Sequence, residues 1–111
     1  MTAQEARSMT NKVIQTKLDA FEQLKIGGIA VKYFIDGKIM DAIEHGKSSI
    51  FFSIEAFISA TNAPMMELTE MIELADSICD WYRYTGFNVK TKLMDSALQN
   101  NALCDNVIIE W

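Results

Sequence analysis

Apolar residues recur at helical spacing over the first 24 positions of the chain. Thr2 and Glu5 have the spacing of a capping box, so the pattern predicts a helix that begins at Ala3. The helix carries two adjacent apolar stripes, and a helix that is apolar over so wide an arc needs more than one neighbour. We therefore predict a homo-oligomer that uses the second stripe as its interface, with one wide core that covers both stripes as the alternative. The first stripe contains Ala6, Met9, Val13, Ala20 and Leu24, and the second contains Ile14, Leu18 and Phe21.

The segment from residue 29 to residue 45 fits two secondary structures. Asp36-Gly37 is a strong hairpin signal, and apolar residues alternate before it. The positions after it keep helical spacing, whereas strict alternation would place Asp41 on an apolar face. We therefore predict a helix, in which the glycine costs about 1 kcal/mol relative to alanine. The preceding Gly27-Gly28 pair is then either a break between two helices or a weak point in one long helix.

Gly46-Lys47-Ser48 matches the last three positions of a phosphate-binding loop. That loop needs an earlier glycine where this chain has Asp41, and it needs a strand before it and a helix after it. Here the order is reversed, because a helical pattern ends at the glycine and an alternating segment follows. The sequence predicts a helix capped by Gly46 and then a strand with Ile50, Phe52 and Ile54 on one face.

A connecting stretch, "EAFISATNAP" at residues 55–64, leads to a second long amphipathic pattern, which starts near Asn62 and Pro64 and ends at Gly86. Like charges at helical spacing cost stability, so we hypothesise that its acidic side meets a basic surface on a partner protein; a face covered only by water is the alternative. The predicted buried face contains Leu68, Met71, Ile72, Ala75, Ile78, Cys79 and Tyr82. The opposite side, here called the acidic row, contains Glu67, Glu70, Glu73, Asp76 and Asp80.

Two alternating segments close the chain, at residues 87–94 and 103–111, with a polar turn between them. They predict an antiparallel pair, and the terminal Trp111 is expected to be tied into the sheet. The order of elements is α-α-β-α-β-β. The fold class is therefore α+β, with a small antiparallel-containing sheet of about three strands and helices on one face.

Length and composition narrow the class further. A chain of 111 residues is long enough for one core, so we expect a single domain over residues 1–111. The net charge of −5 repels phosphate backbones, which argues against direct binding of nucleic acid. No apolar stretch approaches the roughly 18 residues that span a bilayer, and the N-terminus lacks an apolar signal region. We expect a soluble cytoplasmic protein that does not bind membranes.

Residues that could perform chemistry are sparse. The one histidine, His45, has no partner at a fixed spacing, and the sequence contains no cluster of metal ligands. We therefore predict no catalytic residue, no metal and no cofactor, and a binding protein rather than an enzyme. Cations near the predicted strands form a candidate anion site, and two aromatic residues are candidate contacts or, alternatively, core. The cations are Lys47, Arg83, Lys90 and Lys92, and the aromatic residues are Trp81 and Tyr84.

Four short stretches, "MTAQEAR", "IEHGKSSIFFSI", "YTGFNV" and "VIIEW", resemble a diffuse family of short bacteriophage-encoded proteins, mostly of unknown function. The resemblance implies a phage accessory protein in the host cytoplasm that acts on host physiology or defence by capturing a host protein or a small nucleotide signal. The alternative that it implies is a minor virion or assembly component. The shared positions are caps, turns and core strand residues, so the resemblance assigns no binding residue.

Overall fold

A three-stranded antiparallel sheet is the base of the fold in the computed structural model, which describes residues 1–62, 66–93 and 104–111. Its strands are β3 (Ser49–Ser53), β4 (Asn88–Leu93) and β5 (Cys104–Glu110), in the order β3-β5-β4. Ile109 of β5 pairs with Ile50 of β3 and with Val89 of β4. The predicted pairing of the last two strands is confirmed. The central place of β5 was not predicted, because alternation indicates which face a residue takes but not which strands are neighbours.

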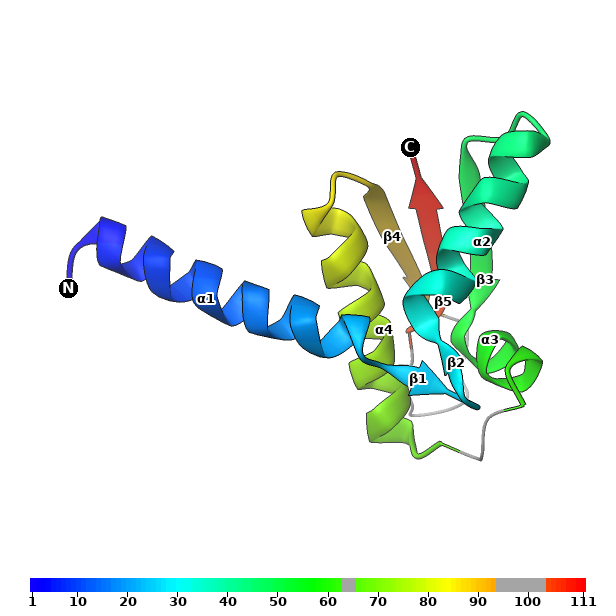
Figure 1. Cartoon of the computed structure of the whole chain (residues 1–111), viewed down its shortest axis with the longest axis horizontal. Helices are drawn as coiled ribbons and strands as arrows, with labels where there is room; N and C mark the ends of the chain where they lie inside the picture. The colour runs from blue at the N-terminus through cyan, green and yellow to red at the C-terminus, as the bar shows by residue number, and fades with distance from the viewer. Residues whose placement is uncertain (63–65, 94–103) are drawn as a thin grey trace.

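Helices cover one face of this sheet, and the predicted α+β class is confirmed (Figure 1). Ile50 and Phe52 of β3, Val89 of β4 and Val107 and Ile109 of β5 are buried on the inward face, although Thr91 of β4 is exposed; Phe51 on the other face is 64% exposed. None of the helices in the described ranges is long and apolar enough to cross a membrane. The helices are α1 (Ala3–Glu22), α2 (Val31–Glu44), α3 (Ile54–Ala60) and α4 (Leu68–Tyr84), and a short hairpin of β1 (Lys25–Ile26) and β2 (Ile29–Ala30) joins α1 to α2.

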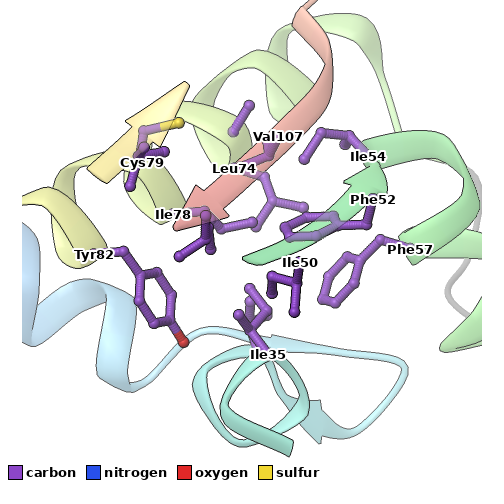
Figure 2. Close-up of a cluster of buried hydrophobic side chains, with 14 of the residues drawn as sticks. Ile35, Ile50, Phe52, Ile54, Phe57, Leu74, Ile78, Cys79, Tyr82 and Val107 are labelled. Carbon is purple, nitrogen blue, oxygen red and sulfur yellow. The ribbon is translucent and has the colours of Figure 1, made fainter. Parts of the chain in front are cut away.

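The core lies between the sheet and helices α2, α3 and α4 (Figure 2). Phe57 of α3 is central to it, since its ring centroid lies 5.0 Å from that of Phe34 and 5.7 Å from that of Phe52. Ile78 and Tyr82 of α4 are almost completely buried. The described part of the chain has no buried side-chain nitrogen or oxygen without a hydrogen-bond partner. The core is therefore apolar and its polar groups are satisfied.

Capping residues set two helix ends as the sequence predicted. The Thr2 hydroxyl accepts a hydrogen bond from the Glu5 amide at 3.1 Å, and α1 begins at Ala3. At the end of α2, Gly46 has φ +72° and its amide donates to the Ile43 carbonyl at 3.0 Å. The Lys47 amide donates to the carbonyl three residues before the cap, at 2.8 Å, which completes a Schellman motif. Gly46-Lys47-Ser48 thus ends a helix and is not a phosphate-binding loop.

Residues 29–45 are mainly helical, as predicted, and the hairpin lies earlier. Gly27 and Gly28 have φ +58° and +82°, and they form the turn between β1 and β2. Both central positions of a type I′ hairpin turn need positive φ, which glycine adopts without steric cost. The glycine pair is therefore neither a simple helix break nor a weak point in one helix.

Two predicted boundaries before α4 are wrong. The stretch expected to connect is partly the helix α3, because the Ser53 hydroxyl caps it by accepting from the Ala56 amide at 3.1 Å. Asn62 does not cap the next helix, since its φ of +52° is left-handed whereas a capping residue is extended. α4 begins after Glu67 instead, and Pro64 lies outside the described residues.

The C-terminus is tied to the sheet as predicted. The Trp111 amide donates to the Ser48 carbonyl at 3.0 Å, and its ring lies 6.1 Å from that of Phe87. The polar turn predicted between the last two strands falls within residues 94–103, which lie outside the described residues.

Candidate functional site

The N-terminal half of α1 extends away from the rest of the molecule, at the blue end of Figure 1. Every residue from Met1 to Val13 is exposed, and Met9 and Val13 are 55% and 56% exposed. Burial on this helix starts only beyond Ile14, which is half-buried. We call residues 3–13 the projecting segment.

The second half of α1 packs on α4 within the same chain. Phe21 is 2% exposed, and its ring lies 5.5 Å from that of Trp81 and 6.4 Å from that of Tyr82. Leu18 is 6% exposed. The predicted oligomer interface of Ile14, Leu18 and Phe21 is thus corrected, because two of these three side chains are already covered by their own chain. The stripe that remains open is the other one, with Ala6, Met9 and Val13.

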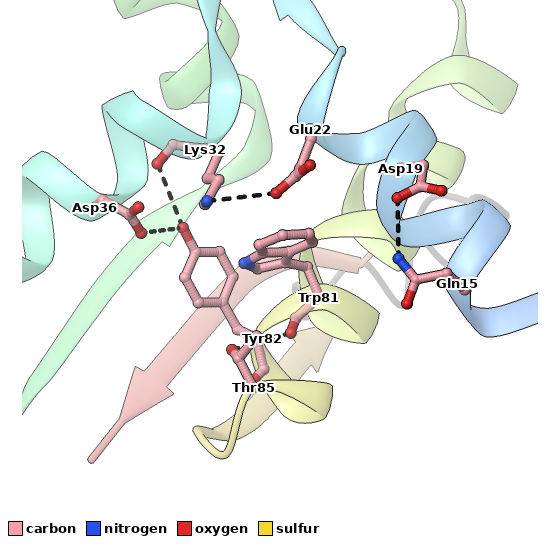
Figure 3. A network of polar contacts seen from close by, with 8 residues as sticks. All are labelled: Gln15, Asp19, Glu22, Lys32, Asp36, Trp81, Tyr82 and Thr85. Atoms are coloured by element: carbon pink, nitrogen blue, oxygen red, sulfur yellow. Dashed lines mark hydrogen bonds and ion pairs between the residues drawn. The ribbon is translucent and has the colours of Figure 1, made fainter. Parts of the chain in front are cut away.

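A polar junction fixes α1, α2 and α4 to one another (Figure 3). The Tyr82 hydroxyl donates to Asp36 Oδ1 at 2.7 Å, and burial together with this hydrogen bond raises the pKa of Tyr82 above its ordinary range. Lys32 Nζ lies 3.6 Å from Glu22 Oε1 and 4.8 Å from the centre of the Trp81 ring. Trp81 is therefore packed inside this junction and is not an exposed aromatic contact.

The acidic row lies on the outer side of α4. Glu70, Glu73, Asp76 and Asp80 are all exposed, and Glu67 is exposed at the start of the helix. Ile72, which was predicted to be buried, is 40% exposed beside them, because its position on the helix points away from the sheet. Among the described residues, the one ion pair of the row joins Asp80 to Lys17 Nζ at 4.0 Å. The row is a concentrated negative charge with one apolar side chain next to it.

A groove of about 350 Å³ separates the start of α4 from the β1 hairpin. Buried Ile26 and Leu74 supply apolar lining, and Glu70 and Glu73 supply carboxylates. Such a groove suits an apolar side chain that has a cation next to it. The sequence did not predict it, because the groove depends on how the hairpin packs against a helix about 45 residues further along the chain.

Tyr84 lies at a different place from Trp81. It is 59% exposed and lines a second groove, of about 400 Å³, where α1 crosses α4. Ile14 and Lys17 line the same groove from α1. The two aromatic residues predicted as one contact group therefore have separate surroundings, although they are three residues apart on one helix.

The structure separates Lys47 from the other predicted anion-binding cations. The Arg83 guanidinium donates to the Val89 carbonyl at 3.1 and 3.3 Å, and Lys90 Nζ lies 3.5 Å from Glu110 Oε1. Lys47 precedes β3, and β5 lies between β3 and β4, which separates these two strands by roughly 10 Å. The side chain of Lys92 lies outside the described ones. Arg83 and Lys90 thus bond to the chain itself.

His45 lies at the end of α2, where its Nδ1 is 2.8 Å from the Asp41 carbonyl. Its side chain is exposed, and this contact is that of a helix end. Within residues 1–62, 66–93 and 104–111, no group of three His, Cys, Asp or Glu side chains is placed to hold a metal ion.

No family model matches the chain, and neither the curated proteins nor the solved structures contain a match to it.

Proposed function

We propose that this chain is a non-enzymatic binding protein that captures a basic protein surface through the acidic row of α4. The observation that carries this proposal is the presence of four exposed carboxylates on one side of a single helix. Like charges three and four residues apart destabilise a helix, and a cationic partner removes that repulsion. The adjoining groove adds apolar contact to the electrostatic attraction.

A protein partner is better supported than a small nucleotide signal. A nucleotide needs several cations around its phosphates, whereas Arg83 and Lys90 are engaged by groups of their own chain. The resemblance to short bacteriophage proteins supports a phage-encoded accessory protein in the host cytoplasm, with a host protein as one source of the basic surface.

Charge reversal on α4 tests the proposal. Cells that express tagged chain are treated with a carbodiimide, which joins carboxylates to lysines in contact, and the joined peptides are identified by mass spectrometry. We expect partner lysines joined to residues 68–84 in the wild type and not in the Glu70→Lys, Asp76→Lys variant. The control is Glu44→Lys with Glu55→Lys, which changes the charge equally at two exposed carboxylates of α2 and α3. Equal capture by both variants would contradict the proposal.

A second candidate function is that of an assembly component of a phage particle. The observation that favours it is the projecting segment, which offers Ala6, Met9 and Val13 to other molecules. Mass spectrometry of purified particles tests it, with the chain expected at a fixed copy number. Particles without the chain would remove this candidate and leave the binding protein.

A further inference from the structure

We propose that the basic surface captured by the acidic row is the projecting segment of a second copy of this chain, and that two copies exchange these contacts as a symmetric dimer. This inference rests on the proposed function, because it requires that the acidic row binds a basic protein surface. It names the partner of that surface.

The charges of the two surfaces are complementary. The projecting segment carries Arg7 and Lys12 against one carboxylate, Glu5, for a net charge of +1. α4 carries four carboxylates against Arg83, for a net charge of −3. Within one chain, Lys17 of α1 already forms an ion pair with Asp80 of the acidic row, which is the kind of contact proposed between two copies. Opposite charges on two facing surfaces steer association and fix its register.

The two surfaces also match in length and shape. Ala3 to Val13 spans ten residue steps, as does Glu70 to Asp80, and each is about 15 Å long at 1.5 Å per residue. On the projecting segment, Lys12 lies three residues after the exposed Met9 and Glu5 lies four residues before it, so both border the apolar stripe, whereas Arg7 lies on another side of the helix. An apolar stripe with Lys12 at its edge is complementary to the apolar lining and the carboxylates of Glu70 and Glu73 in the groove, which Lys25 also lines. The chain's own α1 does not line that groove, so it is open to another molecule.

The length of the projecting segment further favours a partner that covers it. Isolated helices shorter than about 12–15 residues are marginal in water, and most helical stability in proteins comes from packing of an apolar side. The projecting segment continues the anchored half of α1, but its eleven residues pack on nothing in the described part of the chain, and they gain this stability when another copy covers them.

Pairing of two projecting segments with each other is the competing arrangement of a second copy. It places Arg7 and Lys12 of one copy near the same cations of the other, and like charges at facing positions are unfavourable. Docking on α4 replaces this repulsion with attraction. It also produces a closed two-fold dimer, because the projecting segment of each copy binds α4 of the other.

Two charge-reversed variants of the full chain test the arrangement. The α1 variant is Arg7→Glu with Lys12→Glu, and the α4 variant is the Glu70→Lys, Asp76→Lys protein used above. In each variant alone, the facing surfaces carry the same sign, so we expect self-association at least about tenfold weaker by analytical ultracentrifugation. In a mixture of the two variants, both contacts pair opposite signs again, and we expect a heterodimer. The Glu44→Lys, Glu55→Lys control should dimerise as the wild type does, and added salt should weaken every dimer.

Restored association in the mixture also shows that both variants are folded. A mixture that stays monomeric overturns the dimer, as does wild-type self-association that neither variant alters. A monomeric wild type whose α4 variant still loses carbodiimide-linked partners overturns the dimer but retains the proposed function. If the α4 variant changes neither self-association nor partner capture, both proposals fail.

Discussion

The two halves of α1 have similar sequence patterns and opposite environments. Leu18 and Phe21 in the second half are almost completely buried, whereas Met9 and Val13 in the first half are more than half exposed. Each half has apolar residues at helical spacing. The difference is that the second half crosses α4 and the first half extends past it (Figure 1). An amphipathic stripe therefore indicates that a helix needs a neighbour, but not whether that neighbour belongs to the same chain.

The largest effect should come from truncating an apolar residue in the buried half, compared with the same change in the exposed half. Phe21→Ala removes a buried ring that contacts Trp81 and Tyr82, and we expect a loss of about 3–5 kcal/mol in the free energy of unfolding. Met9→Ala should change it by less than about 0.5 kcal/mol in the monomer. Urea unfolding at low protein concentration measures both. Similar losses for the two variants would show that the first half is covered within the monomer.

The sequence predicted most of the fold, because helix caps and alternation are local signals. The cap of α1 at Thr2 and the end of α2 at Gly46 were each predicted from residues a few positions apart, and the structure contains both caps. α3 was missed because its seven residues are too few for helical periodicity to stand out from a connection. The position of β5 between β3 and β4 depends on pairing over long sequence separations, which local patterns do not encode.

The candidate site was only partly predictable for the same reason. The acidic row was predicted from the spacing of carboxylates along one helix, and the structure places these residues on the exposed side of α4. The adjoining groove and the bond between Tyr82 and Asp36 join residues more than 40 positions apart. No spacing rule finds such contacts. Lys47 was grouped with the cations near β4 because the sequence does not indicate that β5 lies between β3 and β4.

A smaller effect is expected at the polar junction beneath the second half of α1. Tyr82→Phe removes the hydroxyl that donates to Asp36, and we expect a loss of about 1–2 kcal/mol near neutral pH. The folded state raises the pKa of Tyr82 above the value of about 10 found in unfolded chains. A raised pKa stabilises the protonated folded form fully below pH 10, and this contribution falls as pH rises beyond it.

The difference in unfolding free energy between wild type and Tyr82→Phe should therefore shrink above about pH 10. Denaturant unfolding of both proteins at several alkaline pH values measures it. A constant difference across the range would show that the phenol of Tyr82 ionises as easily in the folded state as in the unfolded state.

Matched alanine-to-glycine changes compare the backbones of the two halves. Ala6 and Ala20 are both exposed, and each substitution lowers intrinsic helix stability by about 1 kcal/mol. Ala20→Gly should lower the free energy of unfolding by that amount, because its half unfolds together with the core. Ala6→Gly should lower only the helical circular dichroism signal, since the projecting segment frays independently. A full loss of stability from Ala6→Gly would mean that α1 unfolds as one unit.

The smallest effect belongs to Lys17, which lies where the two halves meet. Its Nζ is 4.0 Å from Asp80, and the two side chains are 63% and 50% exposed, so solvent screens the pair. Lys17→Gln should therefore change the free energy of unfolding by less than about 0.5 kcal/mol, and added salt should remove even that change. Chemical unfolding at low and high salt measures it. A loss well above 1 kcal/mol that salt does not remove would mean that this contact, rather than burial of Leu18 and Phe21, holds α1 on α4. The second half of α1 would then be held on α4 by one ion pair and not by burial of its apolar side chains.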